Sequence, residues 1–203
     1  MIKAVIFDYG NVISKAATGD ASQELSALSG VPASVFTSVY ERFRFDFDRG
    51  LISGEEMYRQ LLEEDGYIEQ ANNAELLKKL ARRDADSWRA IHDDVVEWIH
   101  SLKDAGYKTG ILSNMPTIFL DLYENEIPPF VEADFACFSC RVQMIKPEPE
   151  IYHYTLNGLD VKPEEAVFFD DVQENIDAAL NLGMKAFLWT GLEKAKLDFA
   201  GLL

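Results

Sequence analysis

The chain has 203 residues, of which 48% are hydrophobic and 27% are charged, a composition typical of globular rather than disordered proteins. This length suffices for one or two domains with a substantial buried core. The formal net charge of −16 argues against nucleic acid or an anionic membrane as partner, because the summed field repels both. It does not exclude a phosphorylated substrate, since local cationic and N–H groups outweigh surface charge screened beyond roughly 10 Å.

The sequence shows no sign of a membrane or secretory segment. No stretch approaches the roughly 20 apolar residues that span a bilayer, and only a short apolar run precedes Asp8. We therefore expect a cytoplasmic protein. The two cysteines, Cys137 and Cys140, lack the second pair of ligands that a structural zinc site needs. Their apolar surroundings favour small buried residues over a redox pair.

Five short runs rich in β-branched and aromatic residues predict strands that are covered on both faces. The first run is residues 4–7, and the others follow much later in the chain, at 107–112, 134–138, 166–169 and 185–189. Helical patterns lie between the later runs. Strands that alternate with helices of this length predict right-handed βαβ units and a parallel sheet.

Three helices are predicted before and between these later strands. One follows a cap at Asp93 and ends before Gly106, because glycine commonly follows the last helical residue. The others cover residues 148–156 and 174–182, and Gly183 ends the last of them.

Residues 16–90 interrupt the alternation with helix signals and no good strand. One helix is predicted from near Pro32 to about Phe45. A capping box at 53–56 starts another, with an apolar stripe of Met57, Leu61 and Leu62. We therefore expect a Rossmann-like, three-layer α/β core of residues 1–15 and 91–203, with a small helical cap domain of residues 16–90.

Chemically active residues follow the predicted strands. The first strand ends in Asp8, the second in Ser113 and the fourth in Asp170 and Asp171, while Lys146 follows the third strand after a short loop. Ligands of open α/β sheets bind at the carboxyl ends of the strands. We therefore expect these residues to converge on one crevice.

This set of residues resembles the haloacid dehalogenase (HAD)-like hydrolase superfamily, with its four core motifs in the same order over nearly the whole chain. The likeness is strongest to bacterial sugar-phosphate (glucose-1-phosphate-type) phosphatases. They share the Phe-Asp-x-Gly-Asn-Val motif, here residues 7–12, and a helical cap with a segment like Asp48-Arg-Gly-x-Ile-Ser53. The resemblance implies a phosphatase that hydrolyses a small phosphorylated metabolite, with a sugar phosphate as one candidate.

The resemblance also implies a mechanism and a cofactor. Asp8 would attack phosphorus and form an aspartyl-phosphate, which splits one hard step into two. The cofactor would be Mg²⁺, held by the Asp8 carboxylate, the backbone carbonyl of Gly10 and Asp171. A hard cation of this kind neutralises the phosphoryl oxygens and aligns them for displacement.

Further residues would bind the substrate or support the ligands. Ser113 and N–H groups around Gly10, Asn11 and Asn114 are expected to hold the transferring oxygens. Lys146 would offset the carboxylate charge and stabilise the transition state. Asp170 and Asn175 would orient the loop that carries Asp171. Arg49 would contact the substrate, or would pair with a neighbouring acid, Asp46 or Asp48.

One residue departs from the family pattern. Most phosphatases of the superfamily have a second Asp two residues after the nucleophile, and here that position is Gly10. Loss of a general acid–base group costs roughly 10²–10⁴ in rate. The cap could supply the acid, the substrate could have a good leaving group such as a sugar 1-phosphate, or hydrolysis has been lost. The candidate acids in the cap are Glu41, Asp46 and Asp48.

Two other functions stay open. A haloacid dehalogenase would use Asp8 without a metal, but such relatives usually carry Tyr at the position of Gly10 and a Ser/Asn pattern at Asp170-Asp171, and the two acids favour a metal. A non-catalytic protein that binds a phosphorylated ligand is the second alternative. The sequence alone leaves open which metabolite is the substrate and whether the chain is a monomer or a homodimer.

Overall fold

The structure is a computed structural model that describes residues 1–15 and 21–202, apart from the side chains of Tyr40 and Glu41. The first residues of the predicted cap, 16–20, and the side chain of the candidate acid Glu41 therefore lie outside the described part. Within that part, no helix is long and apolar enough to cross a membrane.

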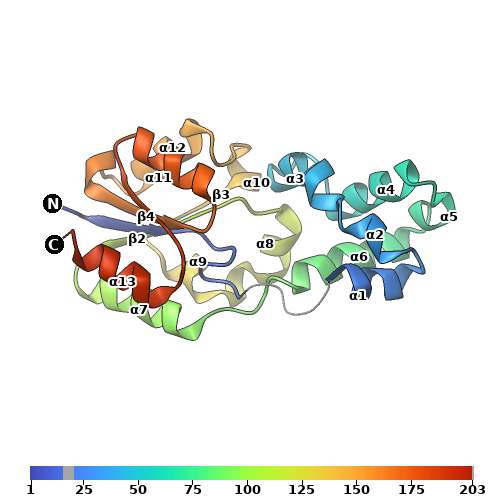
Figure 1. The fold of residues 1–203 in the computed structure, drawn as a ribbon, viewed down its shortest axis with the longest axis horizontal. Coiled ribbons are helices and arrows are strands. Elements are labelled where there is room, and N and C mark those ends of the chain that lie inside the picture. The colour runs from blue at the N-terminus through green and yellow to red at the C-terminus, as the bar shows by residue number, and fades with distance from the viewer. Residues whose placement is uncertain (16–20, 203) are drawn as a thin grey trace.

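A five-stranded parallel sheet forms the centre of the α/β part (Figure 1). Its strands are β1 (Ala4–Phe7), β2 (Lys108–Ser113), β3 (Phe135–Phe138), β4 (Ala166–Asp170) and β5 (Lys185–Leu188). They lie in the order β3-β2-β1-β4-β5, so β1 is flanked by β2 and β4. The five predicted strands and the parallel α/β fold are confirmed.

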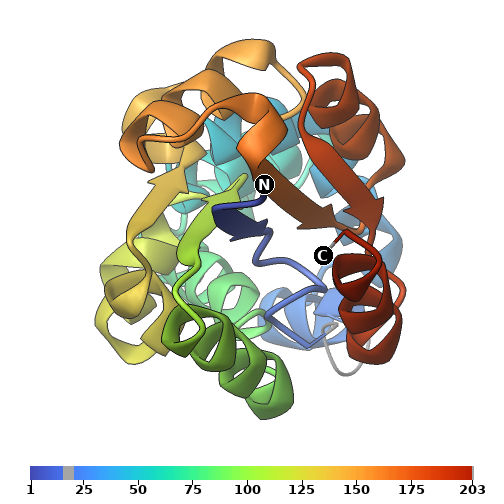
Figure 2. The same cartoon turned by 90° about the vertical axis from the view of Figure 1, so that its left-hand side faces the viewer.

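Helices cover both faces of the sheet, as Figure 2 shows along the strands. Two separate apolar cores result, because successive strand residues point to opposite faces. Phe7 packs into one core with α7 and α13, and Ile6 packs into the other with α11 and α12. The helices of this part are α7 (Asp93–Asp104), α8 (Thr117–Tyr123), η1 (Glu124–Glu126), α9 (Pro128–Glu132), α10 (Ser139–Val142), α11 (Pro149–Gly158), η2 (Pro163–Glu165), α12 (Gln173–Asn181) and α13 (Leu192–Ala200).

The predicted helix ends are close to the observed ones. Helix α7 includes Asp93 as its first residue, with His92 at the capping position and no side-chain cap, so the prediction of Asp93 as cap was wrong by one residue. Gly183 follows α12 with a φ of 89°, a conformation that glycine adopts without a Cβ penalty.

Between β1 and β2 the chain forms a group of helices, here called the helical segment (Ala21–Asp86), which Figure 1 shows at the end opposite the sheet. It has its own apolar core, which includes Met57, Leu61 and Leu62 with no exposed surface. Its helices are α1 (Ala21–Ser29), α2 (Ala33–Phe36), α3 (Val39–Asp48), α4 (Gly54–Glu64), α5 (Ile68–Ala71) and α6 (Ala74–Asp86).

Two details of the helical segment differ from the prediction. The helix expected from Pro32 to about Phe45 is interrupted between α2 and α3, at residues 37–38. At the start of α4 the hydroxyl of Ser53 accepts from the N–H of Glu56 at 3.1 Å, as a capping box requires. The Glu56 carboxylate, however, binds Arg59 and Gln60 of its own helix.

Candidate active site

Three carboxylates meet at the carboxyl edge of the sheet. Asp8 directly follows β1, Asp170 ends β4 and Asp171 follows it, and Phe169 of β4 pairs with Phe7 of β1. Oxygen atoms of Asp8, Asp170 and Asp171 lie within 4.8 Å of one another. Because β1 and β4 are parallel neighbours, acids at opposite ends of the sequence become a single cluster.

Lys146 lies between two of these carboxylates. Its Nζ is 2.9 Å from Asp8 Oδ1 and 2.6 Å from Asp170 Oδ2. Burial by itself lowers the pKa of Lys146, but the two adjacent carboxylates outweigh burial and raise it. Burial likewise raises the pKa of Asp8, and the neighbouring ammonium opposes that shift. The lysine therefore keeps a positive charge beneath the acidic cluster.

Asp170 is fully occupied by protein donors. Besides Lys146, its oxygens accept from Asn175 Nδ2 at 3.0 Å each, and Oδ1 also accepts from the N–H of Val172 at 2.8 Å. Asp170 is buried, with no exposed surface. It therefore holds Lys146 and the turn into α12, whereas Asp8 and Asp171 line the cavity described below.

Two asparagines position loops rather than point freely at a ligand. The side-chain amide of Asn114 donates to the carbonyl of Lys146 at 3.0 Å and accepts from its N–H at 2.8 Å. Asn11 Nδ2 donates to Asp171 Oδ2 at 2.8 Å, and the backbone N–H of Asn11 donates to Ser14 Oγ at 3.1 Å. The expectation that the N–H of Asn11 holds substrate oxygens therefore needs correction, because Ser14 already occupies that donor.

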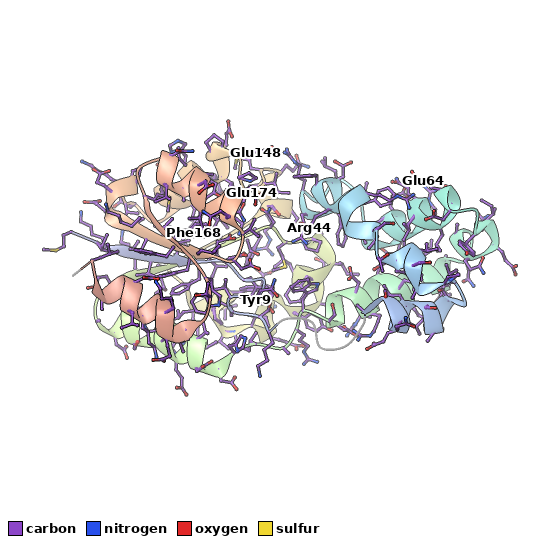
Figure 3. The ribbon with its side chains drawn as sticks, viewed as in Figure 1. Tyr9, Arg44, Glu64, Glu148, Phe168 and Glu174 are labelled. Carbon is purple, nitrogen blue, oxygen red and sulfur yellow. The ribbon has the colours of Figure 1, made fainter. Side chains whose placement is uncertain are left out.

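A cavity of about 580 Å³ opens over the cluster. From the α/β part it is lined by Asp8, Gly10, Ser113, Asn114, Lys146 and Asp171, among others. The helical segment contributes Phe45, Phe47, Asp48 and Asp84, and Trp88 follows just beyond α6. Figure 3 shows Arg44, which also lines the cavity, at the junction of the two parts. The residues predicted to converge on one crevice therefore do share a cavity.

Arg49 lies elsewhere. Its guanidinium pairs with Glu148, at the start of α11, and it is not among the residues that line the cavity. The interpretation of Arg49 as a substrate contact is therefore not supported by its position, and neither is the alternative of a pair with Asp46 or Asp48. Arg49 instead joins the helical segment to the α/β part.

Two further cavity residues were not identified from the sequence: Asp84 in α6, and Trp88 just beyond the end of that helix. A signal for Asp84 exists, because it continues the apolar spacing of Leu77, Leu80 and Ala81 along one helix face. An acid at such a position is buried by the helix geometry, and Asp84 is indeed 5% exposed. Trp88 carries no comparable signal, since it lies outside the helix.

The oxygen atoms at this edge suit a hard divalent cation. Asp8 and Asp171 present carboxylate oxygens, and within the described chain the carbonyl of Gly10 accepts no backbone hydrogen bond. Mg²⁺ prefers a small number of such ligands together with water and phosphate oxygens. The type and spacing of these oxygen atoms therefore suit Mg²⁺. A hydrogen bond from Asn11 also orients Asp171.

A parallel α/β sheet with acids at the carboxyl ends of two neighbouring strands is the arrangement that the sequence motifs predicted. The chain matches the family model "haloacid dehalogenase-like hydrolase" over residues 2–183. It therefore belongs to the haloacid dehalogenase-like hydrolase family, as its four motifs predicted.

Comparison with individual proteins gives more distant likenesses. A bifunctional epoxide hydrolase 2 of Mus musculus is 36% identical over 104 residues, which are 49% of this chain and only 19% of the mouse protein. The putative phosphatase YhcW of Bacillus subtilis is 27% identical over 93% of this chain and 83% of its own. The solved structure of the HAD family enzyme bt-2542 of Bacteroides thetaiotaomicron, in complex with magnesium and inorganic phosphate, superposes with a TM-score of 0.76 at 20% identity, covering 97% of this chain and 99% of that one. This structural likeness shows the fold.

Proposed function

We propose that the chain is a Mg²⁺-dependent phosphatase that hydrolyses a small phosphorylated metabolite through an aspartyl-phosphate on Asp8. The observation that carries the proposal is the cavity in which Asp8, Lys146 and Asp171 meet. The similarity to a putative phosphatase over most of both chains supports it.

Asp8, the carbonyl of Gly10 and Asp171 would hold the cation. When bound, Mg²⁺ neutralises the phosphoryl oxygens and orients the phosphoryl group for in-line displacement. The occupied Asp170 stays outside this ligand set, because Lys146, Asn175 and the N–H of Val172 use its oxygens.

The local contacts of Asp8 suit it to attack phosphorus. Its Oδ1 accepts from the N–H of Tyr9 at 2.7 Å and lies 2.9 Å from Lys146 Nζ. These contacts fix the rotation of the carboxylate and leave Oδ2 toward Gly10. The attack forms a bond between Asp8 oxygen and phosphorus and breaks the bond to the leaving alcohol. Water then breaks the aspartyl-phosphate bond and releases phosphate.

Ser113 and Lys146 would stabilise the transferring group. Ser113 ends β2, the strand that pairs with β1, and is 2% exposed. Ser113 and Lys146 both line the cavity. A cation and a hydroxyl that are already in place stabilise developing charge without reorganisation. Asn114 supports this arrangement indirectly, through its paired hydrogen bonds to the backbone of Lys146.

The charges around the cavity favour a leaving group without a negative charge. Among its described lining residues, five are acidic and two are basic, and both basic side chains are already paired, Lys146 with Asp8 and Asp170, and Arg44 with Asp48. A second anionic group on the substrate would meet uncompensated carboxylates. Aromatic residues and acids together suit a polyhydroxylated alcohol, so a sugar phosphate remains the leading candidate.

The alternatives differ in what they predict. A dehalogenase would act on carbon without a cation. The two adjacent acids Asp170 and Asp171 favour a metal-dependent reaction instead. A protein that only binds its ligand would keep affinity without turnover.

A panel of phosphorylated metabolites assayed with Mg²⁺ and with a chelator tests the proposal. We expect chelator-sensitive phosphate release and, by intact-mass measurement, a phosphoryl adduct that the Asp8→Asn protein cannot form. Chelator-insensitive halide release, or tight ligand binding with no turnover by any substrate, would contradict the proposal.

A further inference from the structure

The position beside the nucleophile has room for an acid that the chain does not place there. A Cβ built on Gly10 would lie 3.8 Å from the Trp88 ring and 3.9 Å from Asp8 Oδ2, both ordinary contact distances. The alcohol that leaves phosphorus requires a proton, and attack of water on the aspartyl-phosphate requires a base. Another residue of the cavity must supply both, or the reaction relies on water.

Few carboxylates of the described cavity can take this role. Asp8 and Asp171 are committed to attack and to the cation. Glu174 is exposed, in the first turn of α12. Asp46 is exposed and does not line the cavity. Two buried acids of the helical segment remain, Asp48 at the end of α3 and Asp84 in α6.

Asp48 is the one that is tied directly to the catalytic edge of the sheet. Its backbone carbonyl accepts a hydrogen bond from Ser139 Oγ. Ser139 Oγ in turn accepts a hydrogen bond from the N–H of Met115 at 2.8 Å. Met115 lies two residues after Ser113. The backbone of Asp48 is therefore fastened to the loop that would hold the phosphoryl oxygens.

Gly50 brings this part of the helical segment unusually close. It has a φ of 73°, and a Cβ at Gly50 would lie 3.0 Å from Cys140 Cβ and 3.1 Å from Thr117 Oγ1. Only glycine satisfies both the left-handed backbone and the close approach. With the pair of Arg49 and Glu148, three consecutive residues of the helical segment contact the α/β part.

The side chain of Asp48 has the environment of a proton donor. It is 3% exposed, and burial raises its pKa from 3.8 to about 6. Three charged groups face it: Arg44 of α3 and Lys146 of the loop before α11 lower this pKa, and Asp84 of α6 raises it. Arg44 Nε binds Oδ2 at 2.9 Å, and Asp48 lines the cavity over the carboxylate cluster.

We infer that Asp48 is the general acid and base of the proposed phosphatase and replaces the acid that is absent at Gly10. The inference rests on the proposed function. In the first step, as Asp8 oxygen bonds to phosphorus, the Asp48 carboxyl gives its proton to the departing oxygen and an alcohol leaves. In the second, the Asp48 carboxylate takes a proton from water, whose oxygen bonds to phosphorus. Phosphate leaves Asp8, and Asp48 is protonated again.

The test compares the Asp48→Asn protein with the unaltered chain on two substrates, an alkyl phosphate and 4-nitrophenyl phosphate. The nitrophenolate leaves without a proton, so the variant should form aspartyl-phosphate from it within about tenfold of the normal rate. With the alkyl phosphate the same step should slow by roughly 10²–10⁴. Breakdown of the aspartyl-phosphate lacks its base in either case, so the adduct should accumulate in intact-mass spectra.

Two further proteins sharpen the comparison. Asp46→Asn removes an exposed carboxylate of the same helix and should leave both substrates within about twofold. Gly10→Asp, combined with Asp48→Asn, places an acid in the open space beside Asp8. This double variant should form aspartyl-phosphate from the alkyl phosphate at least tenfold faster than the Asp48→Asn protein does.

The outcomes separate the two proposals. No Mg²⁺-dependent turnover or adduct with the unaltered chain would overturn the proposed function, and the role of Asp48 with it. Normal turnover by the unaltered chain would uphold the proposed function. An equal loss in the rate of aspartyl-phosphate formation from both substrates, or no loss, in the Asp48→Asn protein would then overturn the role of Asp48 alone.

Discussion

The hydroxyl of Ser139, at the start of α10, donates a hydrogen bond to the backbone carbonyl of Asp48, at the end of α3. This contact joins two elements that are far apart in the sequence. Ser139 is fully buried, so the hydrogen bond is shielded from water. Through Met115, it connects the helical segment to the loop after β2.

Removal of this hydroxyl should weaken both stability and catalysis. Ser139→Ala leaves the N–H of Met115 and the carbonyl of Asp48 without their buried partner, and each unpaired group costs about 1–3 kcal/mol. We expect a lower free energy of unfolding by urea denaturation and a rate loss on alkyl phosphates that exceeds the loss on 4-nitrophenyl phosphate. Ser101→Ala, at a hydroxyl bonded within α7, is the control and should change stability by less than about 0.5 kcal/mol. Equal behaviour of the two variants would contradict the prediction.

Lys146 should be required for folding stability as well as for turnover. Lys146→Met leaves the buried carboxylates of Asp8 and Asp170 without their cation, and breaking a buried pair in this way typically costs about 3–5 kcal/mol. A fall of about 10²–10³ in kcat is expected from the loss of transition-state stabilisation. Urea unfolding and steady-state assays measure the two effects. Lys185→Met, at an exposed strand residue, provides the comparison, and a Lys146 variant as stable as this control would refute the prediction.

Asn175 should influence the cation through Asp170. Asn175→Ala removes the amide that donates to both oxygens of Asp170, so the turn that carries Asp171 loses its support. Loss of a supporting contact of this kind typically lowers metal affinity by 10- to 100-fold. Calorimetric titration with Mg²⁺ measures the affinity, and Asn181→Ala, at the exposed end of α12, is the control. Unchanged affinity in the Asn175 variant would show that the turn is held by other contacts.

The buried Asp48 predicts a pH dependence of stability. Its pKa is raised by burial from 3.8 to about 6, so between these values the folded chain binds the proton more tightly than the unfolded chain. The contribution of this group to the free energy of unfolding therefore decreases as pH rises from about 4 to 6, by up to roughly 3 kcal/mol. Above about pH 6 the loss of stability from the buried, ionised Asp48 carboxylate stays constant.

Asp48→Asn removes this titration. The free energy of unfolding of the variant, relative to the unaltered chain, should therefore increase between about pH 4 and 6 and then level off. Urea denaturation at a series of pH values measures the difference. A difference that does not vary with pH would mean that Asp48 is ionised in the folded chain throughout this range.

The charge of the cavity predicts substrate preference. Phosphate esters of uncharged polyols should be hydrolysed with a higher kcat/KM than esters of similar size that carry a carboxylate or second phosphate on the alcohol. Added salt should reduce this difference in kcat/KM only slightly, because buried charges are poorly screened. Competition assays with matched pairs of esters provide the measurement, and a preference for the doubly anionic ester would contradict the assignment.

The strand ends were predictable from the sequence because two simple rules coincide there. Short, wholly apolar runs such as Ala4–Phe7 predict buried parallel strands, and ligands gather where such strands end. Asp8, Ser113 and Asp171 could therefore be placed at one edge of the sheet from the sequence alone. Lys146 could be placed near the same edge because only a short loop separates it from the third strand.

Contacts between distant segments were not predictable in the same way. The pair of Arg49 and Glu148, the use of the Asn11 N–H by Ser14 and the reciprocal hydrogen bonds of Asn114 with Lys146 depend on how loops fold over one another. No periodicity encodes such contacts. The break between α2 and α3 has the same origin, because tertiary packing overrides helix propensity there.

The position of β1 at the centre of the sheet has a consequence for biosynthesis. Asp8 is translated before the helical segment and the other strands, whereas its neighbours Asp170 and Asp171 belong to a part of the chain made much later. Until β4 pairs with β1, Asp8, the proposed nucleophile, lacks both Asp171 and the Lys146–Asp170 pair. A nascent or truncated chain thus has no assembled acidic cluster, and the proposed cation site at this edge forms only after β4 has docked on β1.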